Sequence, residues 1–466
     1  MHRRHPGGDE DFLLYAVNAR SGAQRKLTDF KQTRVRIYAL SWERPDEAVI
    51  GLNNRDPKWH DAWLLNFKTG ALEKLHENVE RLDGYMFDEQ LVLRFATRAT
   101  ADGGSEVLKV TPDGTLSLFL EIGFEDSFTT GPSGLTADGR TLYFRDSRGR
   151  DRSVLKAIDV VTGEAPIIAE SDQVDIGGTL NEPVSGRVLA YSTNYLRTEW
   201  HAIDPGLQGD LDFLRDHFEG EWSIASQTKD GRTWVVYHDP VTDPASYVLY
   251  QRDAKSISEL FTIRPALEGK PLVSMHPLEL KSRDGLTLIS YLSLPPGSDR
   301  DGNGRPDQPV SMVLNVHGGP WGRDGFGFDA THQWLANRGY AVLSVNFRGS
   351  TGFGKGFVAA SEKEWAGRMH DDLIDAVNWA IAEKIAPRDK IAIYGGSYGG
   401  YATLMGLTYT PDVFACGVDV VGPSNLETLL ASTPAYWESF KVQLNRRVGD
   451  PRTEEGRELL AERSPQ

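Results

Sequence analysis

The sequence has a single cysteine, Cys416, among its 466 residues. One thiol cannot form an intramolecular disulfide, and it cannot supply a cysteine-rich zinc site. No apolar run approaches the length that spans a bilayer, and the basic N-terminus has no apolar segment behind it, so no signal peptide is visible. The cytoplasm is therefore the default expectation for the compartment, although the loss of an N-terminal signal peptide would leave the same pattern.

Basic clusters are also lacking. The chain has 51 Lys and Arg residues against 66 Asp and Glu residues, which gives a formal net charge of −15. This balance argues against a nucleic-acid or anionic-membrane partner. The histidines of the N-terminal half show no metal-ligand spacing, and we expect no metal and no cofactor. A chain of this length exceeds what one hydrophobic core supports, so two domains are expected.

The stretch IAIYGGSYGGY, residues 391–401, is the strongest functional signal. A β-branched apolar run meets a glycine-rich turn and then a helix-forming stretch, and G-x-S-x-G in that context is typical of a nucleophile elbow. Gly395 and Gly399 avoid a Cβ where strand and helix pass closely. We predict Ser397 as the nucleophile and the Tyr398 N–H, at the helix N-terminus, as an oxyanion donor. A plain glycine-rich turn with a capping serine is the alternative interpretation.

The first half of the chain is a repeat of short strands. In each unit a strand ends in a polar turn with glycine, and a second strand follows. Four short strands in a period of about 45 residues are typical of a β-propeller blade. We expect an incomplete propeller over residues 1–262, with five to six blades and its N-terminal part missing, rather than a β-sandwich. The glycine-containing hairpins lie at 15–29, 63–77, 108–121 and 155–170.

The hydrophobic pattern changes in the second half. We place an interdomain crossing at residues 263–277 and a second domain at 278–466. Continuous apolar strands alternate there with amphipathic helices, which predicts a mostly parallel, doubly wound α/β sheet. Asp371 and Asp372 begin one of these helices, and we interpret them as stabilising its positive end rather than as a catalytic pair. The predicted elements are a hairpin at 278–295, strands at 310–320 and 340–350, and helices at 332–339 and 370–384.

Two further motifs follow strands or turns of this domain. The turn that begins at His317 and contains Gly319 resembles the HGGG-like turns of α/β hydrolases, and the Gly319 N–H is the predicted second oxyanion donor. An ordinary β-turn is the alternative. The segment 299–307 imitates a calcium loop, but Val310 stands where the bidentate glutamate belongs, so we interpret it as an exposed turn.

Together these motifs carry a resemblance that covers essentially the whole chain. The sequence resembles the prolyl oligopeptidase family of serine peptidases, and within it the acylaminoacyl-peptidase and dipeptidyl-peptidase-like members. The resemblance implies Ser397 as nucleophile with Gly319 and Tyr398 as oxyanion donors. It also implies that His317 stands where related dipeptidyl peptidases have a tyrosine, and that Tyr436 and Trp437 help to wall the S1 pocket, unless they are core aromatics. The motifs are HGGPWG, NFRGSTGFGK, YGGSYGGYATL and VGPSNL.

The sequence departs from the family in its triad. In this fold the order is Ser, Asp, His, yet no histidine follows Ser397, and the last one is His370. The aspartates after Ser397 lie in stretches that resemble the family upstream of its acid. We therefore expect a fragment clipped at both ends, with the sheet also incomplete and the triad Asp and His beyond Gln466. Such a fragment would be inactive by itself.

For the intact protein we expect a serine peptidase that hydrolyses short peptides through an acyl-enzyme, with access restricted by the propeller. Its partners are then short peptide substrates, and oligomerisation is left open. Two alternatives use the same residues: an esterase on the same elbow, and a catalytically inactive propeller-based peptide-binding protein.

Overall fold

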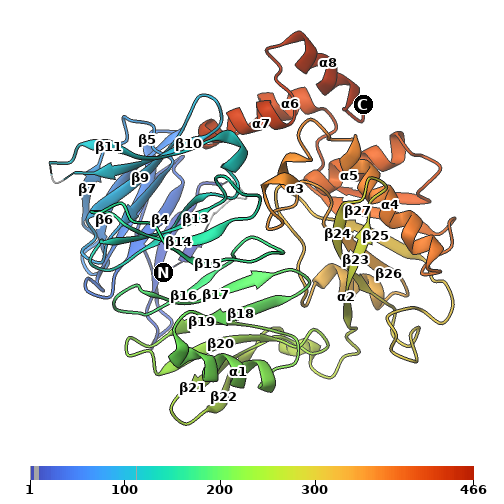
Figure 1. Ribbon diagram of the computed structural model, residues 1–466, viewed down its shortest axis with the longest axis horizontal. Helices are drawn as coiled ribbons and strands as arrows, with labels where there is room; N and C mark the ends of the chain where they lie inside the picture. Colours follow the sequence, from blue (N-terminus) through green and yellow to red (C-terminus); the bar gives the residue numbers. More distant parts are fainter. Residues whose placement is uncertain (1, 5–9, 112) are drawn as a thin grey trace.

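The computed structural model describes residues 2–4, 10–111 and 113–466. The chain forms two parts, a ring of small antiparallel sheets that gives way after residue 262 to a mixed α/β sheet (Figure 1). None of the described helices combines the length and the apolar composition needed to cross a membrane. The fold class expected from the sequence, a β-propeller followed by an α/β-hydrolase domain, is confirmed.

The N-terminal part is a β-propeller of five successive blades, β4 to β22, preceded by the three-stranded sheet β1–β3. Gly22, Gly70, Gly114 and Gly163, which mark the sequence repeat, have φ values from 69° to 83°, so each hairpin uses a left-handed residue. The strands are β1 His2–Arg4, β2 Leu13–Val17, β3 Gln24–Lys26, β4 Val35–Leu40, β5 Glu47–Asp56, β6 Trp59–Asn66, β7 Leu72–His76, β8 Gly84–Phe87, β9 Leu93–Ala99, β10 Ser105–Val110, β11 Leu116–Ile122, β12 Gly131–Leu135, β13 Thr141–Asp146, β14 Val154–Asp159, β15 Ile167–Ala169, β16 Thr179–Asn181, β17 Val188–Asn194, β18 Thr198–Ala202, β19 Glu221–Gln227, β20 Thr233–Asp239, β21 Ser246–Gln251 and β22 Ser256–Thr262.

One blade departs from the four-strand pattern. The sheet β16–β17–β18 has three strands, and helix α1 (Gln208–His217) packs beside β18. Leu207, Leu211 and Leu214 bury one face of this helix in a core that also contains Trp234 of the next blade. Our reading of the sequence did not predict α1, although its leucines recur at helical spacing.

The C-terminal part is built on one six-stranded sheet with the order β23-β24-β26-β25-β27-β28. β23 and β24 form the hairpin predicted at 278–295, and β25 to β28 pair in parallel. The predicted helices 332–339 and 370–384 correspond to α2 and α4. The elements are β23 Met275–Lys281, β24 Thr287–Ser293, β25 Met312–Val316, α2 Ala330–Ala336, β26 Ala341–Val345, α3 Lys355–Ala359, α4 Arg368–Ala382, β27 Ile391–Gly396, α5 Tyr398–Thr408, β28 Cys416–Val420, α6 Leu426–Ala431, α7 Lys441–Arg447 and α8 Glu454–Glu462.

Helices cover both faces of this sheet. Leu314 of β25 and Leu343 of β26 belong to the large core that α4 and α5 complete. Their neighbours Val313 and Val342 point the other way and pack against Leu335 of α2. Because side chains alternate along a strand, these two clusters lie on opposite faces, as a doubly wound sheet requires.

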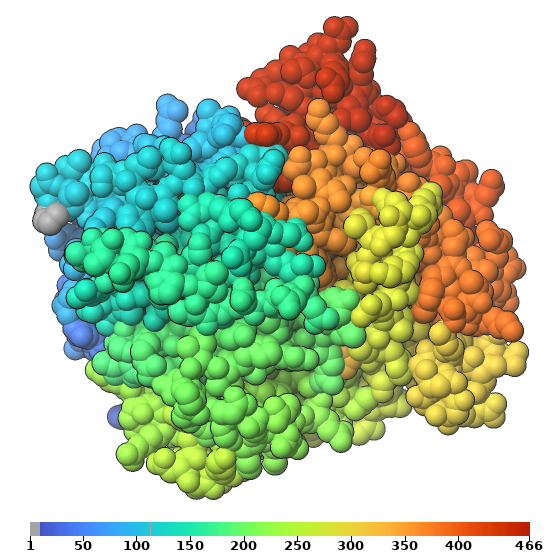
Figure 2. Space-filling model, in the orientation of Figure 1, coloured from blue at the N-terminus to red at the C-terminus, as the bar shows by residue number. Residues whose placement is uncertain are grey.

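The two parts are joined by polar contacts as well as by the chain. Asp151 accepts a hydrogen bond from the Gly356 N–H (2.8 Å), and the Lys355 ammonium lies 2.8 Å from the Asp126 carboxylate. Helix α7 reaches from the α/β part to the propeller near β10 (Figure 1), and the Gln443 amide donates to the Gly103 carbonyl. In Figure 2 the C-terminal segment, in red, lies against both parts.

Candidate active site

Ser397 stands at the sharp turn between β27 and α5. Its backbone has φ 56° and ψ −117°, outside the usual regions for a side chain with a Cβ, and its N–H donates to the Val420 carbonyl at 2.9 Å. A serine forced into this conformation between a strand and a helix is typical of a nucleophile elbow.

The glycines around Ser397 make this turn sterically possible. A Cβ on Gly395 would lie 2.5 Å from the Gly399 carbonyl carbon, and one on Gly399 would lie 2.0 Å from the Val316 carbonyl oxygen. Both distances are far inside van der Waals contact. Gly396 is different, since a Cβ there would meet only the Val420 oxygen at 3.8 Å. The two glycines of the G-x-S-x-G pattern are therefore required by the backbone itself.

The predicted oxyanion donors lie on the two segments that meet at Ser397, the turn after β25 and the first turn of α5. A Cβ on Gly318 would be 3.4 Å from the Ser397 Cβ, so the turn that carries Gly319 passes directly over the nucleophile. Gly319, Ser397 and Tyr398 line the same cavity. The Tyr398 N–H is the first amide of α5, where no carbonyl lies one turn back to accept from it. Two N–H groups can thus converge on one developing oxyanion.

The Tyr398 side chain takes no direct part in this arrangement. Its ring is buried between Phe347 and Trp365, and its hydroxyl contacts the Met369 sulfur at 3.8 Å. Burial raises the pKa of the Tyr398 phenol well above its ordinary value. The predicted role of Tyr398 therefore concerns its backbone amide alone.

The His317 imidazole lies beside the oxyanion turn but does not line the cavity. Its Nδ1 is 2.8 Å from the Gly318 carbonyl oxygen, which can only accept, so Nδ1 carries a proton. Its Nε2 is 3.0 Å from the Ser350 hydroxyl, and its ring stacks on Phe347. With both nitrogens engaged, His317 holds the turn in place and is not free to act as a base.

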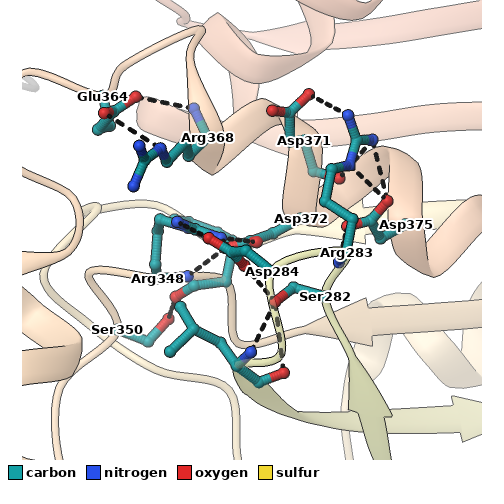
Figure 3. Close-up of polar contacts among 12 residues, drawn as sticks. Ser282, Arg283, Asp284, Arg348, Ser350, Glu364, Arg368, Asp371, Asp372 and Asp375 are labelled. Atoms are coloured by element: carbon teal, nitrogen blue, oxygen red, sulfur yellow. Dashed lines mark hydrogen bonds and ion pairs between the residues drawn. The ribbon is translucent and has the colours of Figure 1, made fainter.

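Ser350 belongs to a loop that a buried ion cluster fixes in place (Figure 3). Only 2% of the Arg348 side chain is exposed, and its guanidinium bonds Asp372 of α4 at 2.7 Å and Asp284 of the β23–β24 turn at 2.8 Å. Hydrogen bonds from Arg348 and Ser282 hold the pKa of the Asp284 carboxyl well below its usual range. Asp372 therefore anchors this loop, which is more than the helix-stabilising role expected from its position.

The cavity at Ser397 has a volume of about 630 Å³, and its wall combines apolar residues with polar ones such as Asn425 and Ser432. Trp437 lines it, as the resemblance implied. Tyr436 does not, because its ring packs under the Arg34 guanidinium of the propeller. Sequence reasoning missed several lining residues, because nothing in their local pattern separates them from core residues. These are Trp365, Leu429, Phe440 and Leu444.

Among the described residues, no histidine, aspartate or glutamate stands beside Ser397 to act as its base. The Ser397 hydroxyl has no hydrogen-bond partner in the part of the chain that the structure describes, and none of the described residues lining its cavity is His, Asp or Glu. His370 lies in α4, where its Nε2 contacts the Thr410 hydroxyl at 3.0 Å and burial lowers its pKa to about 4. Among the described residues, the predicted nucleophile and oxyanion donors therefore have no proton acceptor beside them.

A family model and several known proteins match the sequence of this chain. A family model described as "Prolyl oligopeptidase family" matches residues 326–458. The chain is 50% identical over 465 residues to dipeptidyl aminopeptidase BIII of Pseudoxanthomonas mexicana, covering 100% of this chain and 68% of that protein. It is 34% identical over 492 residues to dipeptidyl peptidase family member 6 of Caenorhabditis elegans, covering 98% of this chain and 66% of that one.

Solved structures share the fold. A puromycin-hydrolyzing peptidase of Mycobacterium tuberculosis superposes with a TM-score of 0.71 at 19% identity, over 100% of this chain and 74% of that one. An acylaminoacyl peptidase of Pyrococcus horikoshii superposes with a TM-score of 0.65 at 17% identity, over 98% of this chain and 73% of that one. The chain spans about two thirds to three quarters of the length of these relatives.

Proposed function

This chain belongs to the prolyl oligopeptidase family, and from that premise we propose that it carries the nucleophile and oxyanion hole of a serine peptidase. The observation that supports this most directly is the strained Ser397 at the start of α5 beneath the Gly318–Gly319 turn. By its likeness to the aminopeptidase of Pseudoxanthomonas mexicana, the intact protein removes dipeptides from the N-termini of short peptides.

The proposed chemistry is acyl transfer. The Ser397 Oγ attacks the scissile carbonyl carbon, the carbonyl oxygen becomes an oxyanion, and the N–H groups of Gly319 and Tyr398 donate to it. Loss of one such donor costs about 10²–10³ in kcat in serine peptidases. The apolar wall around Trp437 receives the side chain next to the scissile bond. When the oxyanion collapses, the C–N bond breaks and the amine leaves with the proton that the base took from Ser397. Water then attacks the acyl-enzyme in the same way, which releases the acid and returns the proton to the serine.

The base that takes the Ser397 proton, and the aspartate that orients it, must come from outside the described cavity wall. We place both beyond Gln466, in the order Ser, Asp, His. Strand β28 is the open edge of the sheet at the elbow, and Val418 on it is 52% exposed, which fits the addition of further strands there. Without a base we expect this chain to lose on the order of 10⁶ in kcat.

A fluorophosphonate probe tests the assignment, since it labels an activated serine. We would treat this chain, the same chain extended through its genomic reading frame, and the Ser397→Ala variant of each. Labelling of the extended chain alone, abolished by Ser397→Ala, supports the peptidase and the external base. Mass spectrometry of a digested pentapeptide then distinguishes dipeptide release from internal cleavage.

A second function has support from the same cavity. A serine with no base beside it suits a protein that binds peptides without cleaving them. If neither chain is labelled although both are folded by circular dichroism, the nucleophile proposal fails and the binding function takes its place.

A further inference from the structure

A second cavity lies between the propeller and the α/β part, and charged side chains line it, whereas none of the described side chains lining the Ser397 cavity is charged. Its volume is about 430 Å³, and its lining combines propeller residues such as Arg145 with Arg323 and Thr351 of the α/β part. Two guanidinium groups therefore face one interdomain space in a chain whose net charge is −15.

Arg145 has no partner for its charge. It lies near the end of β13, where its backbone pairs with Gly131 and Leu155, and its side chain is exposed. Among the described residues, no carboxylate lies within ion-pair distance of its guanidinium and no acceptor bonds to it. Other arginines of the same blade do have partners: Arg140 pairs with Asp159, and Arg148 pairs with Asp146.

Arg323 is held in position by neutral groups. Its Nη1 donates to the Asn194 carbonyl at 2.8 Å, and its Nη2 donates to the Tyr195 carbonyl at 3.2 Å. Phe353 packs against the guanidinium at 4.4 Å. Within the described chain no carboxylate comes within ion-pair distance, and burial lowers the pKa of Arg323 from its ordinary value. The Asp324 and Asp175 carboxylates act on this charge from a distance, and neither forms an ion pair with it. An anion bound in the cavity would therefore stabilise the Arg323 guanidinium further.

One carboxylate does line the cavity, but it is already engaged. Asp175 accepts from the Ser153 N–H at 2.7 Å through one oxygen and from the Gly354 N–H at 3.0 Å through the other. Burial raises the pKa of the Asp175 carboxyl. Asp175 thus closes a contact between the two parts, and among the described residues it forms an ion pair with neither arginine, although its charge acts on Arg323 from a distance.

The cavity is within a short peptide's reach of the nucleophile. Arg323 follows Gly319 by four residues, so their Cα atoms are at most about 14 Å apart. The two cavities also share an aromatic boundary: Phe128 lines this one and stacks on Trp321, whose ring contacts Phe440 in the wall of the Ser397 cavity. About three to four extended peptide residues span that length.

We propose that Arg145 and Arg323 form a carboxylate-binding subsite for the peptide held at Ser397. The ligand group is either the C-terminal carboxylate of a short peptide or the side chain of an acidic residue in it. The two guanidinium groups supply charge-assisted hydrogen bonds that a neutral peptide cannot receive. This inference rests on the proposed peptidase function in taking the ligand to be a peptide.

Peptide binding to the Ser397→Ala chain tests the subsite without turnover. Isothermal titration calorimetry would compare three probes: penta-alanine with a free C-terminus, the same peptide as its C-terminal amide, and that amide with one alanine replaced by glutamate. We expect at least one of the two charged probes to bind about tenfold more tightly than the neutral amide. Preference for the free acid identifies the C-terminal carboxylate as the ligand, and preference for the glutamate probe identifies the side chain.

Arg145→Gln, added to Ser397→Ala, should abolish that preference and leave the affinity for the neutral amide unchanged. Among the described residues, the Arg145 side chain has no hydrogen bond or ion pair to lose, so the Tm of the variant should not move. Arg140→Gln, just before the start of the same strand, is the matched control and should keep the preference. Equal affinities for all three probes, or a preference that survives Arg145→Gln, would overturn the proposal.

The outcome is separable from that of the peptidase proposal. Fluorophosphonate labelling of the extended chain with no carboxylate preference overturns the subsite alone. A preference that Arg145→Gln removes, in a protein that is never labelled, supports the subsite and overturns the peptidase.

Discussion

Asp371 and Asp372 are adjacent acidic residues at the start of α4, and the structure predicts very different consequences for neutralising them (Figure 3). Asp372 is fully buried and accepts from the Arg348 N–H at 2.8 Å, from its Nε at 2.9 Å and from its Nη2 at 2.7 Å. Asp371 pairs with Arg283 at 2.8 Å, and both of those side chains are more than two-fifths exposed.

The magnitudes follow from burial. Removing one partner of a buried ion pair costs about 3–5 kcal/mol, because the other charge is left uncompensated. In Asp372→Asn the new amide would keep one acceptor oxygen and Asp284 would still bind Arg348, so we expect a cost of about 3 kcal/mol. An exposed pair contributes about 0–1 kcal/mol, which bounds the effect of Asp371→Asn. The helix-dipole contribution is similar for both residues and largely cancels in the comparison.

Thermal unfolding of the two variants and the parent chain measures the difference. At about 2–4 °C per kcal/mol for a domain of this size, Asp372→Asn should lower Tm by about 6–12 °C and Asp371→Asn by less than about 4 °C. Circular dichroism at 20 °C checks that each variant is folded. Equal shifts in Tm would refute the reasoning, since they would mean that both carboxylates act only through the helix terminus.

Two other perturbations test the elbow and the buried histidine of α2, His332. Gly395→Ala should destabilise the protein by about 3 kcal/mol and abolish probe labelling, because the new Cβ would lie 2.5 Å from backbone atoms of Gly399. Gly396→Ala should leave Tm nearly unchanged, because its Cβ meets nothing closer than 3.8 Å. Similar Tm values for the two variants would contradict the steric argument. Burial between Ser293 and Ser344 lowers the pKa of His332 to about 4. Below about pH 6.5 the unfolded chain therefore binds more protons than the folded chain, and stability should fall as the pH drops from 6.5 toward 4. His332→Gln should flatten that decline in a series of Tm measurements against pH, and an unchanged slope would show that His332 does not carry it.

Much of the fold could be predicted because its signals are local. The strand predicted at 310–320 contains β25, the strand predicted at 340–350 contains β26, and the helix predicted at 370–384 overlaps α4. Neighbouring residues set the side-chain period of two in strands, the period of 3.6 in helices and the glycine at each hairpin turn. One sequence therefore suffices to detect these signals. The elbow is local in the same sense, since strand, serine and helix are contiguous.

What could not be predicted depends on contacts between distant segments. Trp365 precedes Ser397 by more than 30 residues and Phe440 follows it by more than 40, and only the packed structure brings both to one cavity. Asp371 and Asp372 look alike in the sequence, and their different partners decide their roles. Sequence spacing does not carry such information, because it does not say how the helix is rotated about its axis, and a rotation of about 100° would bring one residue to the place of the other.

Helix α7 contributes to the wall of the Ser397 cavity and also docks on the propeller. Leu444, in the cavity wall, lies on the same short helix as Arg447, whose buried guanidinium donates to the Phe124 carbonyl of the propeller at 3.1 Å. One part of the wall of the Ser397 cavity is thus hydrogen-bonded to the propeller, which supplies no residue of the elbow. A tilt of the propeller would displace α7 and with it Leu444, so the shape of the Ser397 cavity depends on the position of the propeller.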